Sequence, residues 1–266
     1  MDIDKKLNDL LNWYLVAGVD ETIGDQPTDR FEILGQKKQT SEEVLPNTTQ
    51  PKDGGSIIPK NQSDMYHQDK IASSVQSLKE LKAELLDFDQ CPLKRTATNL
   101  VFVDGSINPS VLFIGEAPGA EEDRVGRPFV GPSGRLLDLM LASIGLDRGR
   151  VLISNTVFWR PPGNRTPTAL EVSSCYPFIE KLIELTLPKL IVALGGPAAR
   201  TLLNQKVGVS KIRGKWFAFG SPNLKQEIPA TVMFHPAYLL RSPDQKKLAW
   251  RDMRMIEKKL KELNMR

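Results

Sequence analysis

The chain has 266 residues, of which 40% are hydrophobic and 26% charged, enough for one globular domain of about 200 residues plus extensions. No apolar run approaches the ~20 residues of a membrane span, and acids among the first residues argue against a secretory leader, so we expect a cytoplasmic protein with no membrane contact. Residues 1–66 hold seven Lys or Arg and twelve Asp or Glu, a balance of −5 that leaves +9 for residues 67–266 and favours a polyanionic partner such as nucleic acid.

The first part of the chain is predicted to lie outside the globular domain. Apolar residues recur at helical spacing over residues 3–17, which predicts a short amphipathic helix within residues 1–19. Residues 20–66 are rich in Pro, Gly, Gln, Thr, Ser and charge, with few aromatics. That composition is typical of a flexible linker, so we expect the folded domain to comprise residues 67–266.

Within residues 67–266, short apolar runs alternate with helical patterns. The runs that we expect to be strands are Val111–Ile114, Val151–Val157, Leu190–Leu194 and Ala230–Phe234. Helices are expected over residues 70–86 and from about residues 134, 169, 197 and 243. This alternation predicts a three-layer α/β/α sandwich around a central, mostly parallel four-stranded sheet. Ligands of such sheets bind outside the carboxyl ends of the strands, so the residues that follow each strand are the candidate site.

The loop after the first strand is the most informative segment. It begins with Gly115 and the carboxylate Glu116, and it surrounds a lone aromatic, Phe129, with glycines. Those glycines stand at positions 115, 119, 126, 131 and 134. An ordinary strand-to-helix turn explains one glycine but not five, so the loop is expected to form a binding site.

Two later segments also follow strands. The second strand carries Asn155 toward its end and leads into a basic loop with Asn164 and Arg165. The fourth strand ends before His235, one of only two histidines in the chain, which is followed by the segment 236–241. Strand ends would bring Glu116, Asn155 and His235 to one pocket.

In this order and spacing, the three segments resemble the uracil-DNA glycosylase superfamily, most closely its bacterial and archaeal iron–sulfur branch, type 4. The resemblance runs from about Leu86 to about Met253. It implies a monofunctional enzyme that flips uracil out of DNA and hydrolyses its N-glycosidic bond through an oxocarbenium-like transition state, which starts base-excision repair. Uracil-containing DNA is then the expected partner.

The resemblance implies catalytic roles for Glu116 and His235. Glu116 would position water or counter the charge of the sugar cation. The best-known branch has an aspartate one position later, where this chain has Ala117, so water activation must differ from that branch. His235 would donate a hydrogen bond to uracil O2 as negative charge develops on the leaving base.

Other residues are expected to bind uracil. The amide of Asn155 can pair with the N3–H and O4 edge of uracil, whereas cytosine presents the opposite pattern. Phe129 would stack on the flipped base, with Gly115 beside it. Glu122 would shape the pocket against the thymine methyl. The plainer alternatives are a turn-forming Asn155 and a core aromatic at position 129.

The residues expected to contact DNA are Asn164, Arg165, Tyr238, Leu239, Leu240 and Arg241. The segment 238–240 resembles the loop that wedges into the duplex, and Arg241 would hold a phosphate. The alternative for the two leucines is the apolar face of the final helix. Asn164 and Arg165 would contact the DNA backbone or support the pocket.

The cluster of the resembling branch is incomplete in this chain. Type 4 glycosylases bind a [4Fe–4S] cluster through four cysteines, and this chain has two cysteines in total. Cys91 and Cys175 match the second and fourth ligands, while Phe88 and Trp159 stand at the first and third positions. Neither aromatic side chain ligates iron, so we expect no cofactor, with the two rings filling the volume of the cluster and two buried free thiols.

Two other classes of function stay open. One is a non-catalytic DNA-binding protein on the same fold, and the other is a glycosylase for another deaminated base such as hypoxanthine or xanthine. The helix of residues 1–19 would dock on a repair or replication protein, or serve only as a solubilising tail. A monomer is expected.

Overall fold

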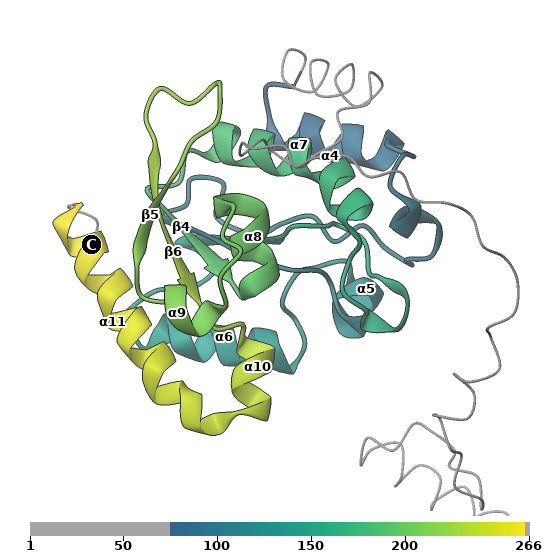
Figure 1. Ribbon diagram of the computed structural model, residues 1–266. Coiled ribbons are helices and arrows are strands. Elements are labelled where there is room, and N and C mark those ends of the chain that lie inside the picture. The colour runs from purple at the N-terminus through teal and green to yellow at the C-terminus, as the bar shows by residue number, and fades with distance from the viewer. Residues whose placement is uncertain (1–74, 264–266) are drawn as a thin grey trace, which may run out of the picture. The chain divides into compact units, whose positions relative to one another are not determined.

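The computed structural model describes residues 75–263, which are drawn in colour in Figure 1. The predicted helix of residues 1–19 and the predicted linker of residues 20–66 lie outside the described residues. Both therefore stay predictions, and so does the start of the domain at residue 67.

A six-stranded sheet runs through the centre of the domain (Figure 1). In spatial order its strands are β1 (Asp104–Gly105), β3 (Val151–Asn155), β2 (Val111–Gly115), β4 (Leu190–Leu194), β6 (Ile228–Met233) and β5 (Trp216–Phe219). The four middle strands run parallel, and every residue of β2, β3 and β4 is buried. Because both faces of these strands are covered, they are continuous apolar runs, which is why the sequence locates them.

The sheet has two edge strands that the sequence analysis did not predict. β1 and β5 pair antiparallel with β3 and β6, so the predicted count of four strands is wrong. β1 has 2 residues, and β5 has exposed positions between its more buried ones. β1 is too short and polar to form an apolar run, whereas β5 is a run of four apolar residues, Trp216–Phe219, that the sequence analysis did not single out. The parallel core itself is as predicted.

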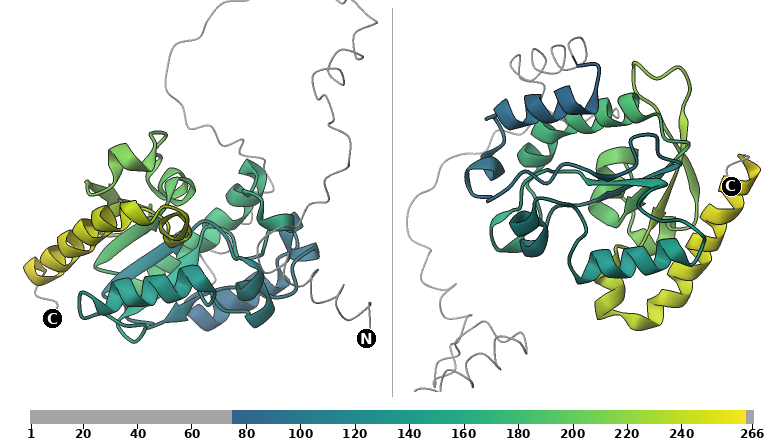
Figure 2. Two further views of the ribbon diagram at one scale, coloured as in Figure 1. Left: turned by 90° about the horizontal axis from the view of Figure 1, so that it is seen from below. Right: turned by 180° about the vertical axis from the view of Figure 1, so that it is seen from behind.

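Helices cover both faces of the sheet (Figures 1 and 2). One face carries α4 (Leu78–Asp87), α7 (Ala169–Thr186) and α8 (Gly196–Leu203), and the other carries α6 (Pro132–Ala142) and α11 (Lys246–Glu262). Leu112 and Ile114 of β2 pack on the first face, whereas Val111 and Phe113 pack on the second. This alternation follows from the two-residue repeat of a strand, and it confirms the predicted three-layer α/β/α sandwich.

Shorter helical segments connect the layers. They are α5 (Ala120–Val125), α9 (Val209–Ile212), α10 (Pro236–Arg241), and the 3-10 turns η1 (Pro92–Arg95), η2 (Pro162–Asn164) and η3 (Pro243–Gln245). The helix predicted from residue 243 begins at Lys246, and α10 is a separate helix before it. Pro243 explains the break after α10, because it starts the turn η3 and has no amide hydrogen to continue the preceding helix.

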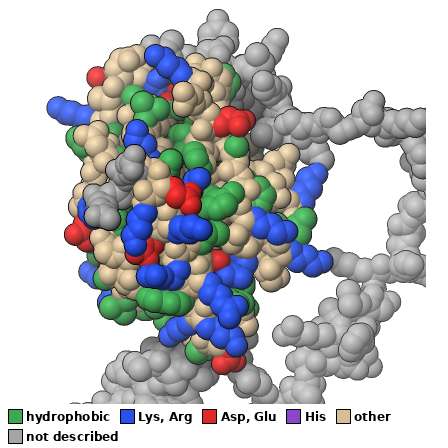
Figure 3. Space-filling view, turned by 90° about the vertical axis from the view of Figure 1, so that its left-hand side faces the viewer, with side chains coloured by type: hydrophobic (Ala, Val, Ile, Leu, Met, Phe, Trp, Pro, Cys, Tyr) green, Lys and Arg blue, Asp and Glu red, His purple; other side chains and the backbone are tan. Residues whose placement is uncertain are grey.

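The last helix, α11, is strongly basic on its outer side. Figure 3 looks onto this side of the molecule and shows Lys and Arg side chains spread over it between hydrophobic ones. The exposed basic residues of α11 are Lys246, Lys247, Arg251, Arg254, Lys258 and Lys261. Among the helices of residues 75–263, none combines the length and the apolar character needed to cross a membrane.

Candidate active site

A cavity of about 410 Å³ lies at the carboxyl ends of the parallel strands. Its lining includes nine of the residues singled out from the sequence, namely Glu116, Glu122, Phe129, Asn155, Asn164, Arg165, His235, Tyr238 and Arg241. Gly115 and Asn155 are partners in the register of β2 and β3, each at the last residue of its strand. His235 comes two residues after β6 and caps α10. The expected convergence of strand ends therefore occurs in the structure.

Asn155 lines this cavity with a buried side-chain amide. Its side chain is 1% exposed, and neither the nitrogen nor the oxygen of its amide has a hydrogen-bond partner among the described residues. A buried polar atom without a partner costs about 1–3 kcal/mol, so such an arrangement is rare unless it serves a ligand. The amide offers two donors and an acceptor to a planar group that enters the cavity.

Gly115 is small because two side chains meet over it. A Cβ at position 115 would lie 2.5 Å from Oδ1 of Asn155 and 2.6 Å from Cζ of Phe129, closer than real Cβ contacts allow. The Phe129 ring also lies 5.5 Å, centroid to centroid, from the ring of His235, at an interplanar angle of 32°. Gly115, Phe129, Asn155 and His235 thus form one contact group.

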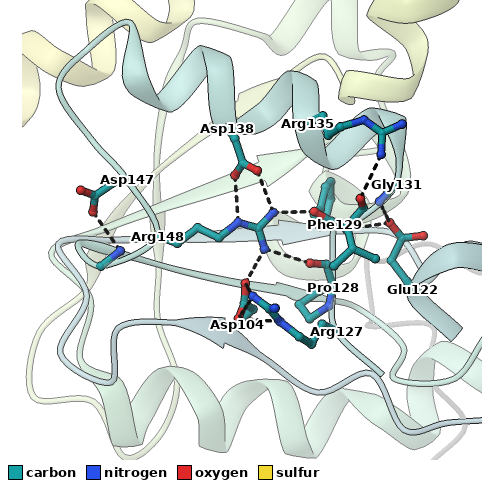
Figure 4. A network of polar contacts seen from close by, with 12 residues as sticks. Asp104, Glu122, Arg127, Pro128, Phe129, Gly131, Arg135, Asp138, Asp147 and Arg148 are labelled. Atoms are coloured by element: carbon teal, nitrogen blue, oxygen red, sulfur yellow. Dashed lines mark hydrogen bonds and ion pairs between the residues drawn. The ribbon is translucent and has the colours of Figure 1, made fainter. Parts of the chain in front are cut away.

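The loop that carries Phe129 is fixed by two charged side chains (Figure 4). Glu122 is 7% exposed, and its carboxylate accepts hydrogen bonds from the amides of Val130 and Gly131, both at 2.9 Å. Arg148 donates to the carbonyls of Pro128 and Phe129 from the opposite side. Glu122 therefore fixes the backbone of this loop, while its role against the thymine methyl stays a prediction.

His235 is held in one orientation and one tautomer. Its Nδ1 accepts a hydrogen bond of 3.1 Å from the amide of Ala237, so the ring proton resides on Nε2. Burial lowers the pKa of His235 to about 4, and the nearby charge of Arg241 acts in the same direction. The imidazole is consequently neutral at pH 7 and can donate from Nε2 only.

Glu116 is a half-buried carboxyl at the end of β2. Burial raises its pKa, while the hydroxyl of Thr166 and the charge of Arg200 act in the opposite direction. Its backbone is fixed, because the hydroxyl of Thr156 donates to the Glu116 carbonyl at 2.7 Å. Such a carboxyl can act as a base or as a counter-charge for a cation.

Only two of the three residues predicted to wedge into the duplex, 238–240, are exposed. Tyr238 and Leu240 are 37% and 42% exposed, but Leu239 is 1% exposed and packs with Phe234 and Ala249. Leu239 is therefore a core residue of α10 rather than part of an exposed wedge. For Leu239 this agrees with the alternative of an apolar helix face, although the helix is α10 and not the final one: in a helix the side chain between two exposed ones can face the core.

The basic loop after β3 is tied to α7. Arg165 forms two hydrogen bonds with the Glu171 carboxylate, at 2.9 and 2.6 Å, and Asn164 accepts one from Arg160 at 2.7 Å. The bonds from Arg165 lower the pKa of Glu171 to about 2, against the effect of its burial. Of the two predicted roles for Arg165, support of the pocket wall matches these contacts, while contact with DNA stays a prediction.

The sequence matches the profile of the uracil DNA glycosylase superfamily over residues 102–254. The chain belongs to this superfamily. It is 37% identical to a type-4 uracil-DNA glycosylase of Sulfurisphaera tokodaii, over 68% of this chain and 83% of the relative. It is 43% identical to the type-4 enzyme of Thermotoga maritima, over 57% of this chain and 77% of the relative. The type-4 enzyme of Archaeoglobus fulgidus is 37% identical over 64% and 86%.

Membership of the superfamily confirms the resemblance drawn from the three sequence segments, and with it the expectation of an enzymatic glycosylase. A type-5 uracil-DNA glycosylase of Pyrobaculum aerophilum is also similar, at 36% identity, but only over 37% of this chain and 50% of the relative. The type-4 similarity is thus the broader one.

The positions that match the type-4 cluster ligands form an apolar core. Cys91 and Cys175 are fully buried, with their sulfur atoms 3.8 Å apart. Phe88 and Trp159 are each 3% exposed, and their rings lie 6.5 Å apart in a stacked arrangement. Phe178 adds an edge contact to Phe88 at 4.9 Å. Two thiols cannot supply the four ligands of a [4Fe–4S] cluster, so the side chains at these positions do not fit that group. More broadly, within residues 75–263 no three His, Cys, Asp or Glu side chains gather as a metal site.

Two supporting residues were not found from the sequence. Thr156 holds the carbonyl of Glu116, and Arg148 holds the loop of Phe129. Thr156 directly follows Asn155, so its place after a strand was a usable signal. Arg148 lies in an ordinary polar turn before β3, and nothing in the local sequence distinguishes it.

Proposed function

We propose that this protein is a uracil-DNA glycosylase, which flips uracil out of DNA and hydrolyses the bond between the base and the deoxyribose. The family supports glycosylase chemistry, and the type-4 relatives point to uracil as the base. The cavity supports the proposal because four suitable groups line it together. They are an amide that can bind the base, a ring that can stack on it, a neutral hydrogen-bond donor and a carboxyl, from Asn155, Phe129, His235 and Glu116.

The unpartnered amide of Asn155 is the observation that carries the choice of base. Uracil presents an N3–H donor beside the O4 acceptor, which satisfies the oxygen and the nitrogen of the amide together. Cytosine presents the reverse pattern and leaves both amide atoms unpaired in a dry site.

The chemistry is assigned to His235 and Glu116. The departing base carries negative charge on O2, and the Nε2–H of a neutral imidazole stabilises that charge without giving up its proton. Glu116, when ionised, stabilises the sugar cation or orients the attacking water. Tyr238 and Arg241 line the cavity, and Leu240 is exposed between them in α10; we assign these three residues to the DNA strand beside the flipped nucleotide.

We further propose that the protein works without an iron–sulfur cluster. Phe88 and Trp159 are buried in the same core as the two thiols, whose sulfur atoms lie 3.8 Å apart, and this packing supplies the stability that metal bonds would otherwise provide. The test is the iron content of aerobically purified protein together with its activity. Iron-free protein that excises uracil supports the proposal, and activity that depends on bound iron contradicts it.

The function is tested with an oligonucleotide that contains one uracil, followed by alkaline cleavage at abasic sites. Wild-type protein and Asn108→Asp, a change at an exposed position outside the cavity, should both release uracil, while Asn155→Asp should lose this activity and still bind DNA. Parallel oligonucleotides with hypoxanthine or xanthine identify a different base preference. DNA binding without release of any base would favour a non-catalytic DNA-binding protein.

A further inference from the structure

The turn before β3 reaches back to the loop that carries the stacking ring. Arg148 donates to the carbonyl of Pro128 at 3.2 Å and to the carbonyl of Phe129. Figure 4 shows its guanidinium facing this loop, with one carboxylate above it, Asp138, and another below it, Asp104. Asp138 of α6 accepts from Nε at 2.8 Å, and Asp104 of β1 accepts from the same guanidinium.

The backbone at Phe129 requires such support. Its φ angle is +54°, in the left-handed region that residues other than glycine seldom adopt. A conformation of this kind costs about 1–3 kcal/mol and persists only where the surroundings hold it. The carbonyl of Phe129 also packs so closely on Gly134 that a Cβ there would lie 1.8 Å from the oxygen.

The loop is therefore held from two directions. Glu122 binds the amides of Val130 and Gly131, which follow Phe129, and Arg148 binds the carbonyls of Pro128 and Phe129. An acceptor on one side and a donor on the other fix the orientation of successive peptide planes. The Phe129 side chain then projects over Gly115 toward Asn155.

We propose that Arg148 is a positioning residue for base recognition: through its bonds to the loop carbonyls, it holds Phe129 where the flipped base stacks. This inference rests on the proposed function of the same cavity. Arginine suits the role because its planar fork has five N–H donors, enough to bind two carboxylates and two carbonyls at once. A lysine ammonium has three donors at one point and cannot span the same partners.

The test is a double-mutant cycle on the single-turnover rate of uracil excision. Arg148→Lys should slow excision by about 10–100-fold, because a displacement of about 1 Å in a positioning group has effects of this size. In a Phe129→Leu background, the same change should have almost no further effect, because the ring that Arg148 positions is already gone. Equal slowing in both backgrounds, or no slowing in either, would overturn the inference.

Arg127→Lys is the matched control. Arg127 binds the same carboxylate, Asp104, at 3.0 Å, but its side chain is 56% exposed and it makes no bond to the loop carbonyls. Its replacement should leave the excision rate within about 2-fold, as for most exposed substitutions. Asp104→Asn is a milder way to loosen Arg148, and it serves the same cycle if Arg148→Lys does not fold.

A second measurement tests the position of the Phe129 ring without depending on catalysis. With 4-fluorophenylalanine at position 129, the fluorine resonance of the free protein should be a single sharp line that broadens or shifts in Arg148→Lys and not in Arg127→Lys. An unchanged line would overturn the positioning role. Wild-type protein that fails to release uracil would instead refute the proposed function, and the fluorine signal would still decide the role of Arg148.

Discussion

Replacement of Asn155 by leucine should separate the effect of the Asn155 amide on the stability of the fold from its effect on uracil excision. The residue is 1% exposed, and both polar atoms of its side chain lack a hydrogen-bond partner. Leucine has a similar volume and removes both atoms. Each unpaired buried polar atom costs about 1–3 kcal/mol, so their removal should stabilise the fold, less the crowding of two methyl groups near Phe129. We expect a net gain of about 1–3 kcal/mol.

For a domain of this size, that gain corresponds to a rise in the melting temperature of about 3–10 °C. Activity should change in the opposite direction. Two hydrogen bonds to the base are worth about 2–3 kcal/mol in total, so excision of uracil should slow by about 30–150-fold. Calorimetry and single-turnover excision on the same protein samples provide the two measurements.

The two results refute different steps of the reasoning. A melting temperature that falls by several degrees would mean that the Asn155 amide is hydrogen-bonded in the free protein, so that it does not lower the stability of the fold. An unchanged excision rate would mean that the base is read by another group. Asn155→Asp complements this variant, because it keeps the shape but changes the donor pattern, and we expect it to lose uracil excision or to gain some activity on cytosine.

Three further predictions follow from the site and the core. The excision rate of wild-type protein should fall as pH decreases through the raised pKa of Glu116, because the carboxylate must be ionised. Glu116→Gln should lack this decrease at low pH, since His235 has a pKa of about 4 and stays neutral at higher pH. Gly115→Ala should leave the protein folded but reduce excision by at least about 10-fold, as measured in single turnover, since its Cβ would displace the stacking ring by contact at 2.6 Å. Phe88→Ala should lower the free energy of unfolding by about 3–5 kcal/mol in chemical denaturation, whereas Trp250→Ala, at a ring that is 49% exposed, should change it by less than about 1 kcal/mol.

The parts of the site that follow strands could be predicted from the sequence. β2, β3 and β4 are buried throughout, so their apolar runs mark where each strand ends and which residue comes next. That rule places Glu116, Asn155 and His235 at one edge of a parallel sheet without any knowledge of distances. The Phe129 loop was found for a related reason, because its glycines permit close approaches that leave a trace in the sequence.

The parts that depend on contacts between distant segments could not be predicted. Arg148 reaches Phe129 across 19 residues and Asp104 across 44, and an arginine in a polar turn looks the same whether or not it has such partners. The choice between an exposed wedge and a buried helix face for Leu239 stayed open for a similar reason. Whether it points outward depends on α10 being a helix, and α10 is only 6 residues long, too short for a periodic pattern to identify.

The exchange of cluster ligands for aromatic rings is consistent with an intact site because the two lie in different cores. Phe88, Cys91, Trp159 and Cys175 belong to the core beneath α4 and α7, whereas Phe129 belongs to the core on the opposite face of the sheet, beneath α6. A change of packing in the first core reaches the cavity chiefly through β3 and the segment that follows it. Its effect should therefore appear as a loss of stability and not as a loss of base recognition, and this separation explains how a chain with two cysteines can keep Phe129, Asn155 and His235 together in one cavity.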